Sequence, residues 1–252
     1  MKIAALALAA MVFCGAAIMV GRARAAEIKV LGTPGVREFY NELVPQFEQA
    51  TGHKVTTEWA GTVDVLKRIG GGETFDMVIM ARNALDELTR QGRIVAASRL
   101  DVAKSGMGVA VRAGAPKPDI SSGEAVKALM LSTQSIAYSS GPSGVYLERL
   151  VQRIGIADQI KSKMKQIPPG GAVGELVARG EAEIGFHQVS ELIPVKGIDI
   201  VGPLPPDIQE ITRFAAGVHA NAAQADAAAA LAAYLAAPAA AAVIRRHGME
   251  PG

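Results

Sequence analysis

The sequence predicts an α/β protein of two lobes, each built on a parallel sheet with helices on both faces. Strand-like and helix-like segments alternate along the chain, which is typical of such sheets. Two longer strand-like runs, 106–114 and 213–218, bracket a self-contained α/β block, which indicates one domain inserted in another. In each half a turn rich in glycine and hydroxyl side chains joins a strand to a helix, at 32–35 and at 139–144.

Residues 1–25 have the pattern of an export signal. Lys2 supplies the positive start, residues 3–20 form an apolar run, and Ala23-Arg24-Ala25 has the small-x-small pattern that precedes signal-peptidase cleavage. We therefore predict cleavage after Ala25 and a periplasmic location. The apolar run is nearly long enough for an uncleaved membrane anchor, which is the alternative.

The composition of the exported chain excludes several classes of function. The precursor has 26 Lys and Arg against 24 Asp and Glu, and the leader takes Lys2, Arg22 and Arg24 with it, so the net charge becomes −1. No basic stripe with interleaved aromatic residues is present, which argues against a nucleic-acid partner. Cys14 is the only cysteine and leaves with the leader. No metal, cofactor or disulfide is expected.

The helices and strands are predicted from hydrophobic periodicity and from glycine and proline breaks. In the first half, strands are expected at 27–33, 54–59 and 75–80, and helices at 36–50, 63–69 and 84–92. In the second half, helices are expected at 122–131, 145–155 and 172–179, and strands at 135–138, 182–186 and 199–203. The tail, 221–252, is mostly alanine in helical register and is broken at Pro238.

The two bracketing runs define the expected domain limits. Lobe 1 is expected to comprise residues 26–107 and 214–252, and lobe 2 residues 113–208, with a linker signal at 115–119. Residues 108–112 and 209–213 are then the crossovers, and they form a two-strand hinge. Ligands of open α/β sheets bind beyond the carboxyl ends of the strands. The two glycine- and hydroxyl-rich turns are therefore expected to face each other across a cleft.

The turns have the chemistry of an anion site. A glycine- and serine-rich turn that opens a helix presents free backbone N–H groups, and the helix dipole adds partial positive charge there. Ser139, Ser143 and Gly144 are the candidates in the second turn. In the first turn the candidates are Thr33, Gly35 and Val36. The plainer interpretation is that Ser143 only caps its helix.

Four further side chains are candidates at the cleft. Arg37 lies in the first turn of its helix, where a cation opposes the dipole unless an anion is near, and Arg82 follows the strand that ends at Met80. Tyr146 lies one turn into its helix and could reach the cleft or the core. Gln188 has an amide that could donate to an oxyanion, and the neighbouring His187 is a weaker candidate.

Several motifs, spread over nearly the whole exported chain, resemble one protein family. They are Thr33-Pro34-Gly35-Val36, Thr74-Phe75-Asp76-Met77-Val78, the run from Gly114 to Ile120, the run from Ala137 to Tyr146, the run from Ala178 to Gly185, and Gly202-Pro203-Leu204-Pro205. Together they resemble the type II periplasmic solute-binding proteins of ABC importers, in the branch related to the molybdate-binding protein. The resemblance implies a two-lobed protein that closes on a small anion and delivers it to a membrane permease. We expect a monomer.

The identity of the anion is left open between two chemistries. Molybdate binders of this family hold their tetrahedral dianion with serine hydroxyls and backbone amides. Because the two turns offer the same donors, molybdate or tungstate is the alternative ligand. Thr33 stands where such proteins often have a serine, and Arg37 and Arg82 lie beside the predicted cleft. An arginine fork suits a planar carboxylate, so a di- or tricarboxylic acid is the main expectation.

An exported hydrolase is the rival class. A serine nucleophile needs a histidine base, and the exported chain has only His53, His187, His219 and His247, none in a recognisable nucleophile motif. No Gly-x-Ser-x-Gly elbow is present. The sequence therefore predicts a binding protein rather than an enzyme.

Overall fold

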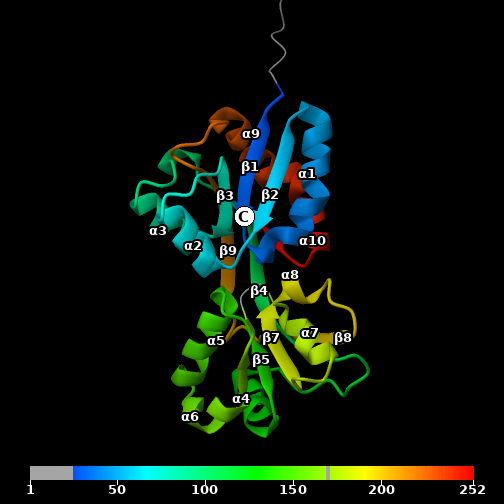
Figure 1. The fold of residues 1–252 in the computed structure, drawn as a ribbon. Helices are drawn as coiled ribbons and strands as arrows, with labels where there is room; N and C mark the ends of the chain where they lie inside the picture. Colours follow the sequence, from blue (N-terminus) through cyan, green and yellow to red (C-terminus); the bar gives the residue numbers. More distant parts are fainter. Residues whose placement is uncertain (1–24, 169–170) are drawn as a thin grey trace, which may run out of the picture.

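The computed structural model describes residues 25–168 and 171–252. The predicted leader, residues 1–25, lies outside these residues except for Ala25. The described chain forms two lobes, one above the other in Figure 1, and strands β4 (Leu100–Arg112) and β9 (Ile211–Val218) run between them. The two-lobed α/β fold predicted from the sequence is therefore confirmed.

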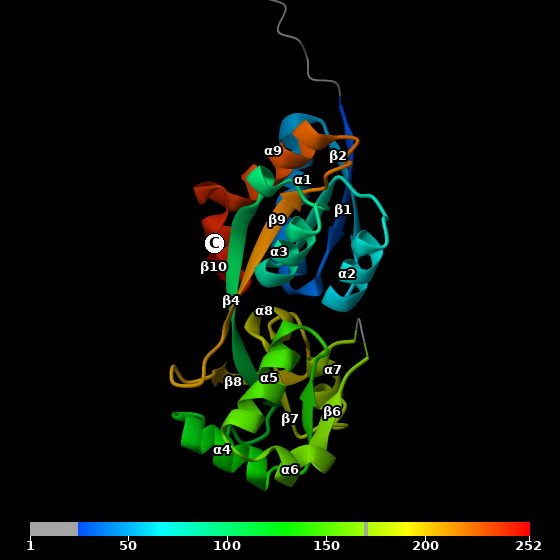
Figure 2. The same ribbon diagram turned by 90° about the vertical axis from the view of Figure 1, so that its left-hand side faces the viewer.

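The upper lobe in Figure 1 contains the N-terminal segment and the C-terminal tail. Its elements are β1 (Glu27–Gly32), α1 (Arg37–Thr51), β2 (Lys54–Trp59), α2 (Thr62–Gly70), β3 (Met77–Ala81), α3 (Arg82–Arg90), α9 (Ala225–Ala236), α10 (Ala241–Arg246) and β10 (Glu250–Pro251). Figure 2 shows α1 and α9 on one side of β1 and β9, with α2 and α3 on the other. The alanine-rich tail is helical and interrupted at Pro238, as predicted.

The lower lobe contains the middle of the chain. Its elements are α4 (Gly123–Ser132), β5 (Ile136–Tyr138), α5 (Pro142–Arg153), α6 (Ala157–Ile160), β6 (Met164–Gln166), α7 (Val173–Ala178), β7 (Ile184–Gln188), α8 (Val189–Leu192) and β8 (Ile198–Pro203). Strand β6 and helix α6 are three and four residues long and were not predicted. Elements this short show no full period of hydrophobicity in the sequence.

The strands join into one sheet of mixed direction, in the order β2-β1-β3-β9-β4-β7-β5-β6. Strands β1, β2 and β3 pair in parallel, as do β5, β6 and β7, which fits the predicted parallel sheets. The crossing strands differ, because β9 is antiparallel to both β3 and β4, and β4 is antiparallel to β7. The chain enters the lower lobe along β4 and returns along β9, so these two strands run in opposite directions.

Strand β4 belongs to both lobes. Its residues 100–106 pair with β9, and residues 107–111 pair with β7. At the change of partner, the side-chain amide of Gln209 accepts from the Met107 N–H at 2.8 Å and donates to the Met107 carbonyl at 3.0 Å. The returning chain is thus tied to the middle of β4. The domain and hinge limits given above remain a prediction.

A buried carboxylate holds the upper lobe together at the start of β3. Asp76 is 3% exposed, and its carboxylate accepts from the backbone N–H groups of Lys29 and Gln224, each at 2.8 Å. It therefore links β1 to the residue that precedes α9.

No single helix among the described residues is long and apolar enough to cross a membrane. Only α9 and the segment Pro238–Arg246 together meet the length and composition test, as a pair bent by 52°.

Replacing Asp76 with asparagine should destabilise the protein. The amide puts an N–H₂ group where a carboxylate oxygen now accepts, so one buried backbone N–H loses its partner. We expect the free energy of unfolding in urea to fall by about 2–3 kcal/mol. The exposed ion-pair substitution Glu250→Gln serves as the control and should change it by less than about 0.5 kcal/mol. Equal effects of the two substitutions would contradict the structural role of Asp76.

Candidate ligand-binding cleft

The two turns singled out in the sequence face one cavity. Thr33 follows β1, and its N–H donates to the Ile79 carbonyl at 3.0 Å, which fixes the first turn against β3. Ser143 lies in the first turn of α5 in the other lobe. Both residues line a cavity of about 480 Å³, which we call the hydroxyl cavity. Its lining also includes Gly35, Thr62, Asp64, Ser140, Gly141, Gln188, Glu191 and Phe214.

The second turn is built on two hydroxyl groups and a close approach of the backbone. The hydroxyl oxygens of Ser139 and Ser143 lie 2.9 Å apart, and Ser139 Oγ accepts from the Gly141 N–H at 3.2 Å. A Cβ atom at Gly144 would lie 1.6 Å from the Ser139 carbonyl oxygen, so only glycine fits there. Ser139 and Gly144 therefore shape the turn, and the neighbouring Ser140 and Ser143 line the cavity.

The first turn has a similar steric requirement. A Cβ atom at Gly35 would lie 2.6 Å from the Phe214 ring of β9. The Gly35 carbonyl accepts at 3.1 Å from the Ser190 hydroxyl of α8, and that oxygen lies 3.3 Å from the hydroxyl of Ser105 in β4. These buried hydroxyl groups connect the first turn to the other lobe and to the crossing strand.

Two buried polar atoms at the hydroxyl cavity have no hydrogen-bond partner among the described residues: Thr33 Oγ1 and Gln188 Oε1. The two residues are 4% and 2% exposed, and the Gln188 amide nitrogen donates to Thr212 Oγ1 at 2.6 Å. Buried polar groups without partners are destabilising, since most such groups in native proteins are paired. A bound ligand or water is therefore expected to pair with them.

Besides Ser139, Gly144 and Arg82, three further predicted site residues do not line the hydroxyl cavity. Val36 is 0% exposed and packs in the core of the upper lobe. Tyr146 is also buried, and its hydroxyl donates to the Ile208 carbonyl at 2.5 Å. The Arg37 guanidinium lies over the Trp59 ring, 5.1 Å from its centre, and lines a separate space of about 430 Å³, which we call the side cavity.

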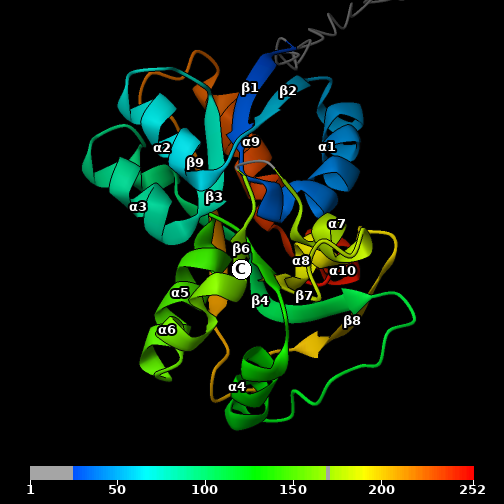
Figure 3. The ribbon, with the colours of Figure 1, turned by 60° about the horizontal axis from the view of Figure 1, so that its bottom comes forward.

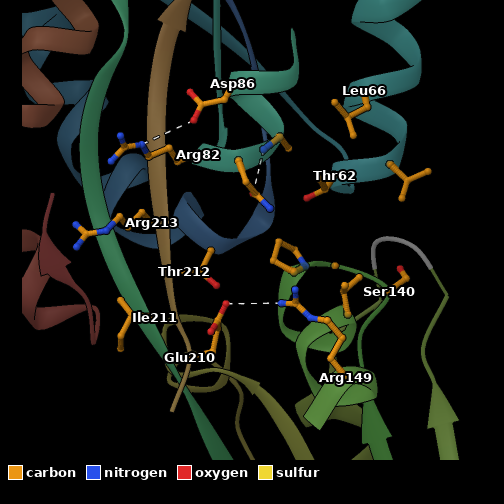
Figure 4. A pocket seen from close by; sticks show the side chains of 16 residues that line it. Thr62, Leu66, Arg82, Asp86, Ser140, Arg149, Glu210, Ile211, Thr212 and Arg213 are labelled. Atoms are coloured by element: carbon orange, nitrogen blue, oxygen red, sulfur yellow. Dashed lines mark hydrogen bonds and ion pairs between the residues drawn. The ribbon is translucent and has the colours of Figure 1, made fainter. Parts of the chain in front are cut away.

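Arg82 lies in a larger, adjoining cavity of about 650 Å³, shown in Figure 4. We call it the arginine cavity, because Arg82, Arg149 and Arg213 line it together with Asp86 and Glu210. Arg82 Nη1 lies 2.9 Å from Asp101 Oδ2, and Arg149 Nη2 lies 3.7 Å from Glu210 Oε1. The walls shared with the hydroxyl cavity are Thr62, Val63, Ser140, Gly141 and Pro142.

The sequence reasoning missed the acidic side chains of this site, among which Glu191 borders two cavities. Glu191 lines both the hydroxyl cavity and the side cavity, and its Oε2 lies 3.2 Å from Nδ1 of the buried His187. Its place could not be predicted from the sequence, because His187 lies in strand β7 and Glu191 in the four-residue helix α8, which is too short to show a helical period. Within residues 25–168 and 171–252, no group of acidic, histidine or cysteine side chains is placed to hold a metal ion.

The fold and the cleft define a solute-binding protein, and the family match covers nearly all of the described chain. Residues 28–250 match the family of bacterial extracellular solute-binding proteins, to which the chain belongs. The chain is 39% identical to an aconitate isomerase from Pseudomonas sp over 230 residues, covering 89% of this chain and 87% of that protein.

Molybdate-binding proteins are also similar to it. The chain is 28% identical to the molybdate-binding protein ModA of Azotobacter vinelandii over 240 residues, covering 93% of this chain and 94% of that protein. Among solved structures, the periplasmic molybdate-binding protein of Azotobacter vinelandii superposes with a TM-score of 0.74 at 21% identity, covering 88% of this chain and 98% of that one. The expected type II, molybdate-binding-like fold is thus confirmed.

The steric requirement at Gly144 can be tested with a matched pair of glycines in the same turn. Gly144→Ala forces the added methyl group against the Ser139 carbonyl, so we expect about 1–3 kcal/mol of destabilisation in thermal or urea unfolding. In Gly141→Ala the added Cβ would be 3.6 Å from its nearest neighbour, at a φ of −84°, so the stability should be unchanged or slightly higher. If both variants unfold alike, the proposed close approach is wrong.

Proposed function

We propose that this protein captures a small organic polycarboxylate between its lobes and delivers it unchanged to the permease of an ABC importer. The proposal includes export to the periplasm by cleavage after Ala25. The observation that carries it is that the hydroxyl cavity and the arginine cavity adjoin, with five lining residues in common. A ligand that spans both meets uncharged donors at one end and guanidinium groups at the other.

The two ends of the cleft suit different parts of such a ligand. The Thr33 and Ser143 hydroxyls and the Ser140-Gly141 turn are suited to one carboxylate, because an anion at a helix N-terminus is favoured by the dipole. Arg82 and Arg149 are suited to a second carboxylate, which charge-assisted hydrogen bonds would hold. Their present partners, Asp101 and Glu210, keep the guanidinium groups in place without the ligand.

A tetrahedral oxyanion is the alternative ligand. The relationship to ModA of Azotobacter vinelandii supports it, as do the uncharged donors of the hydroxyl cavity. A compact dianion would fill only that cavity and would leave the arginine cavity to solvent. The size and charge of the whole cleft therefore favour the polycarboxylate.

A second candidate function is isomerisation of an unsaturated tricarboxylate in the same cleft. The specific support is the 39% identity to the aconitate isomerase from Pseudomonas sp, against 28% for the molybdate-binding protein. Both candidates share the first step, which is binding of a polycarboxylate between the lobes. They differ in whether the ligand leaves unchanged.

Closure about the two crossing segments is part of the proposal. With lobe 1 as residues 26–107 and 214–252 and lobe 2 as residues 113–208, the segments 108–112 and 209–213 would bend as the lobes approach. A ligand that touches both lobes favours the closed form, because it binds that form more tightly. The same linkage stabilises the folded, ligand-bound protein. We expect this protein to act as a monomer.

Ligand screening by thermal shift and calorimetry tests the proposed ligand class. Citrate, cis- and trans-aconitate and smaller dicarboxylates should be compared with molybdate, tungstate, sulfate and phosphate. At a ligand concentration of about 100 times Kd, stabilisation of about 2.7 kcal/mol is expected for a true ligand. Stabilisation by the metal oxyanions alone would refute the carboxylate proposal and favour the alternative.

The role of the arginine cavity can be tested on one helix. Arg82→Ala should weaken binding of a tricarboxylate about tenfold, because one charge-assisted contact is lost. Arg90→Ala is the matched control, since Arg90 lies at the other end of α3, is largely exposed and pairs with Glu87. Unchanged tricarboxylate affinity in Arg82→Ala, measured by calorimetry, would remove Arg82 from the site.

A further inference from the structure

Glu191 brings a negative charge into a cleft that is otherwise suited to anions. Its side chain is 22% exposed, and Oε1 lies 3.6 Å from the position that a Cβ atom would take at Gly35. The carboxylate therefore lies beside the first of the two anion-binding turns. Next to a bound carboxylate it would be repulsive, which lowers affinity unless the charge has another use.

A buried histidine lies against the Glu191 carboxylate. His187 is the fourth residue of β7, its side chain is 6% exposed, and Nδ1 lies 3.2 Å from Glu191 Oε2. One carboxylate oxygen is thus directed to the imidazole, and the other, Oε1, lies nearer the turn at Gly35. A carboxylate oriented by a second group and open to a ligand cavity has the arrangement of a general base.

We propose that Glu191 is a proton-transfer residue, which removes a proton from carbon in an unsaturated polycarboxylate bound in the hydroxyl cavity. This inference rests on the second candidate function, isomerisation. The negative charge beside Gly35 would then serve as the base of that reaction.

The chemistry needs no oxidant or reductant. Aconitate has a methylene carbon next to a carbon–carbon double bond, and rotation about that double bond is blocked. Glu191 takes a proton from the methylene carbon, and the C–H electron pair spreads over the allylic carbons and the attached carboxylate. The carboxylic acid of Glu191 then returns the proton to the other end of the allylic system. The double bond has moved by one carbon, its geometry is set anew, and Glu191 is a carboxylate again.

Asp64 is the other carboxylate on the wall of the hydroxyl cavity. It lies in the first turn of α2 and also borders a shallow surface space lined by Lys67, Arg68 and Glu73. It thus faces solvent and charged side chains on its outer side. Glu191 is instead oriented by the buried imidazole of His187, and this favours Glu191 as the base.

Deuterium incorporation separates binding from proton transfer. The purified protein is incubated with cis- or trans-aconitate in deuterium oxide, and proton NMR follows both the methylene signal and the ratio of isomers. Calorimetry measures the affinity for the same ligand. We expect the unmodified protein to bind aconitate, to exchange its methylene protons and to equilibrate the isomers.

Glu191→Gln keeps the shape of the side chain and removes its basicity. We expect the exchange rate to fall at least about 100-fold, the range lost with a general base. Aconitate affinity should be kept or improved, because a negative charge has been removed from the cleft. The matched control is Glu175→Gln, since Glu175 lines only the side cavity, pairs with Arg179 at 3.6 Å and is well exposed. That variant should exchange and bind as the unmodified protein does.

Each other outcome has a definite meaning. Absence of aconitate binding would overturn the proton-transfer proposal, whereas binding of another polycarboxylate such as citrate would keep the proposed binding function. Binding without exchange in the unmodified protein would overturn the proton-transfer proposal and leave the binding function intact. Isomerisation without deuterium incorporation is resolved with aconitate deuterated at its methylene carbon: transfer of the label to the other allylic carbon supports return of the same proton by Glu191, and retention of the label at its original carbon would overturn the proposal. Full exchange in Glu191→Gln, with loss in Asp64→Asn, would assign the proton transfer to Asp64.

Discussion

The architecture depends on one uninterrupted strand that is hydrogen-bonded in both lobes. Strand β4 changes partners at Met107, from β9 on one side of this point to β7 on the other. Since backbone pairing on both sides fixes its path, the two sheets are held edge to edge as one, and Figure 3 shows the lobes meeting around it. Gln209 adds side-chain hydrogen bonds at the same point, in place of the ladder that β9 has not yet begun.

The position of the cleft follows from this strand. The parallel strands of both lobes end toward the junction, so the segments that follow β1, β5 and β7 all reach it. Turn chemistry then determines what each segment contributes. Gly35 and Gly144 allow backbone to approach Phe214 and Ser139 closely, and the hydroxyl groups beside them line the shared cavity. Ligands of open α/β sheets bind at such carboxyl edges.

The fold could be predicted from the sequence largely because the long elements have clear periodicity and clear ends. The strand expected at 54–59 and the break expected at Pro238 appear there, and the helix expected at 36–50 runs from Arg37 to Thr51. Strand β6 was missed because three residues show no period, and the antiparallel direction of β9 is a property of chain topology rather than of local pattern.

The site was less accessible to sequence reasoning. Thr33, Gly35, Ser143 and Gln188 do line one cavity, since their position follows from strand ends. Tyr146 does not line this cavity, because its position on α5 directs the side chain into the core. Glu191 was missed because the short helix α8 that carries it has no periodicity to predict it, and only the fold brings it to the turn at Gly35.

The buried hydroxyl groups of Ser105 and Ser190 have a consequence for how the cleft opens. The Ser190 hydroxyl donates across the junction to the Gly35 carbonyl, and the two serines are 1% and 3% exposed. Rotation of the lobes away from each other breaks this bond before solvent reaches the broken pair. The earliest part of that movement therefore raises the free energy by about 1 kcal/mol or more. Water then solvates the separated groups and lowers the free energy again, so breaking this one bond forms a small kinetic barrier to release of a ligand enclosed in the cleft.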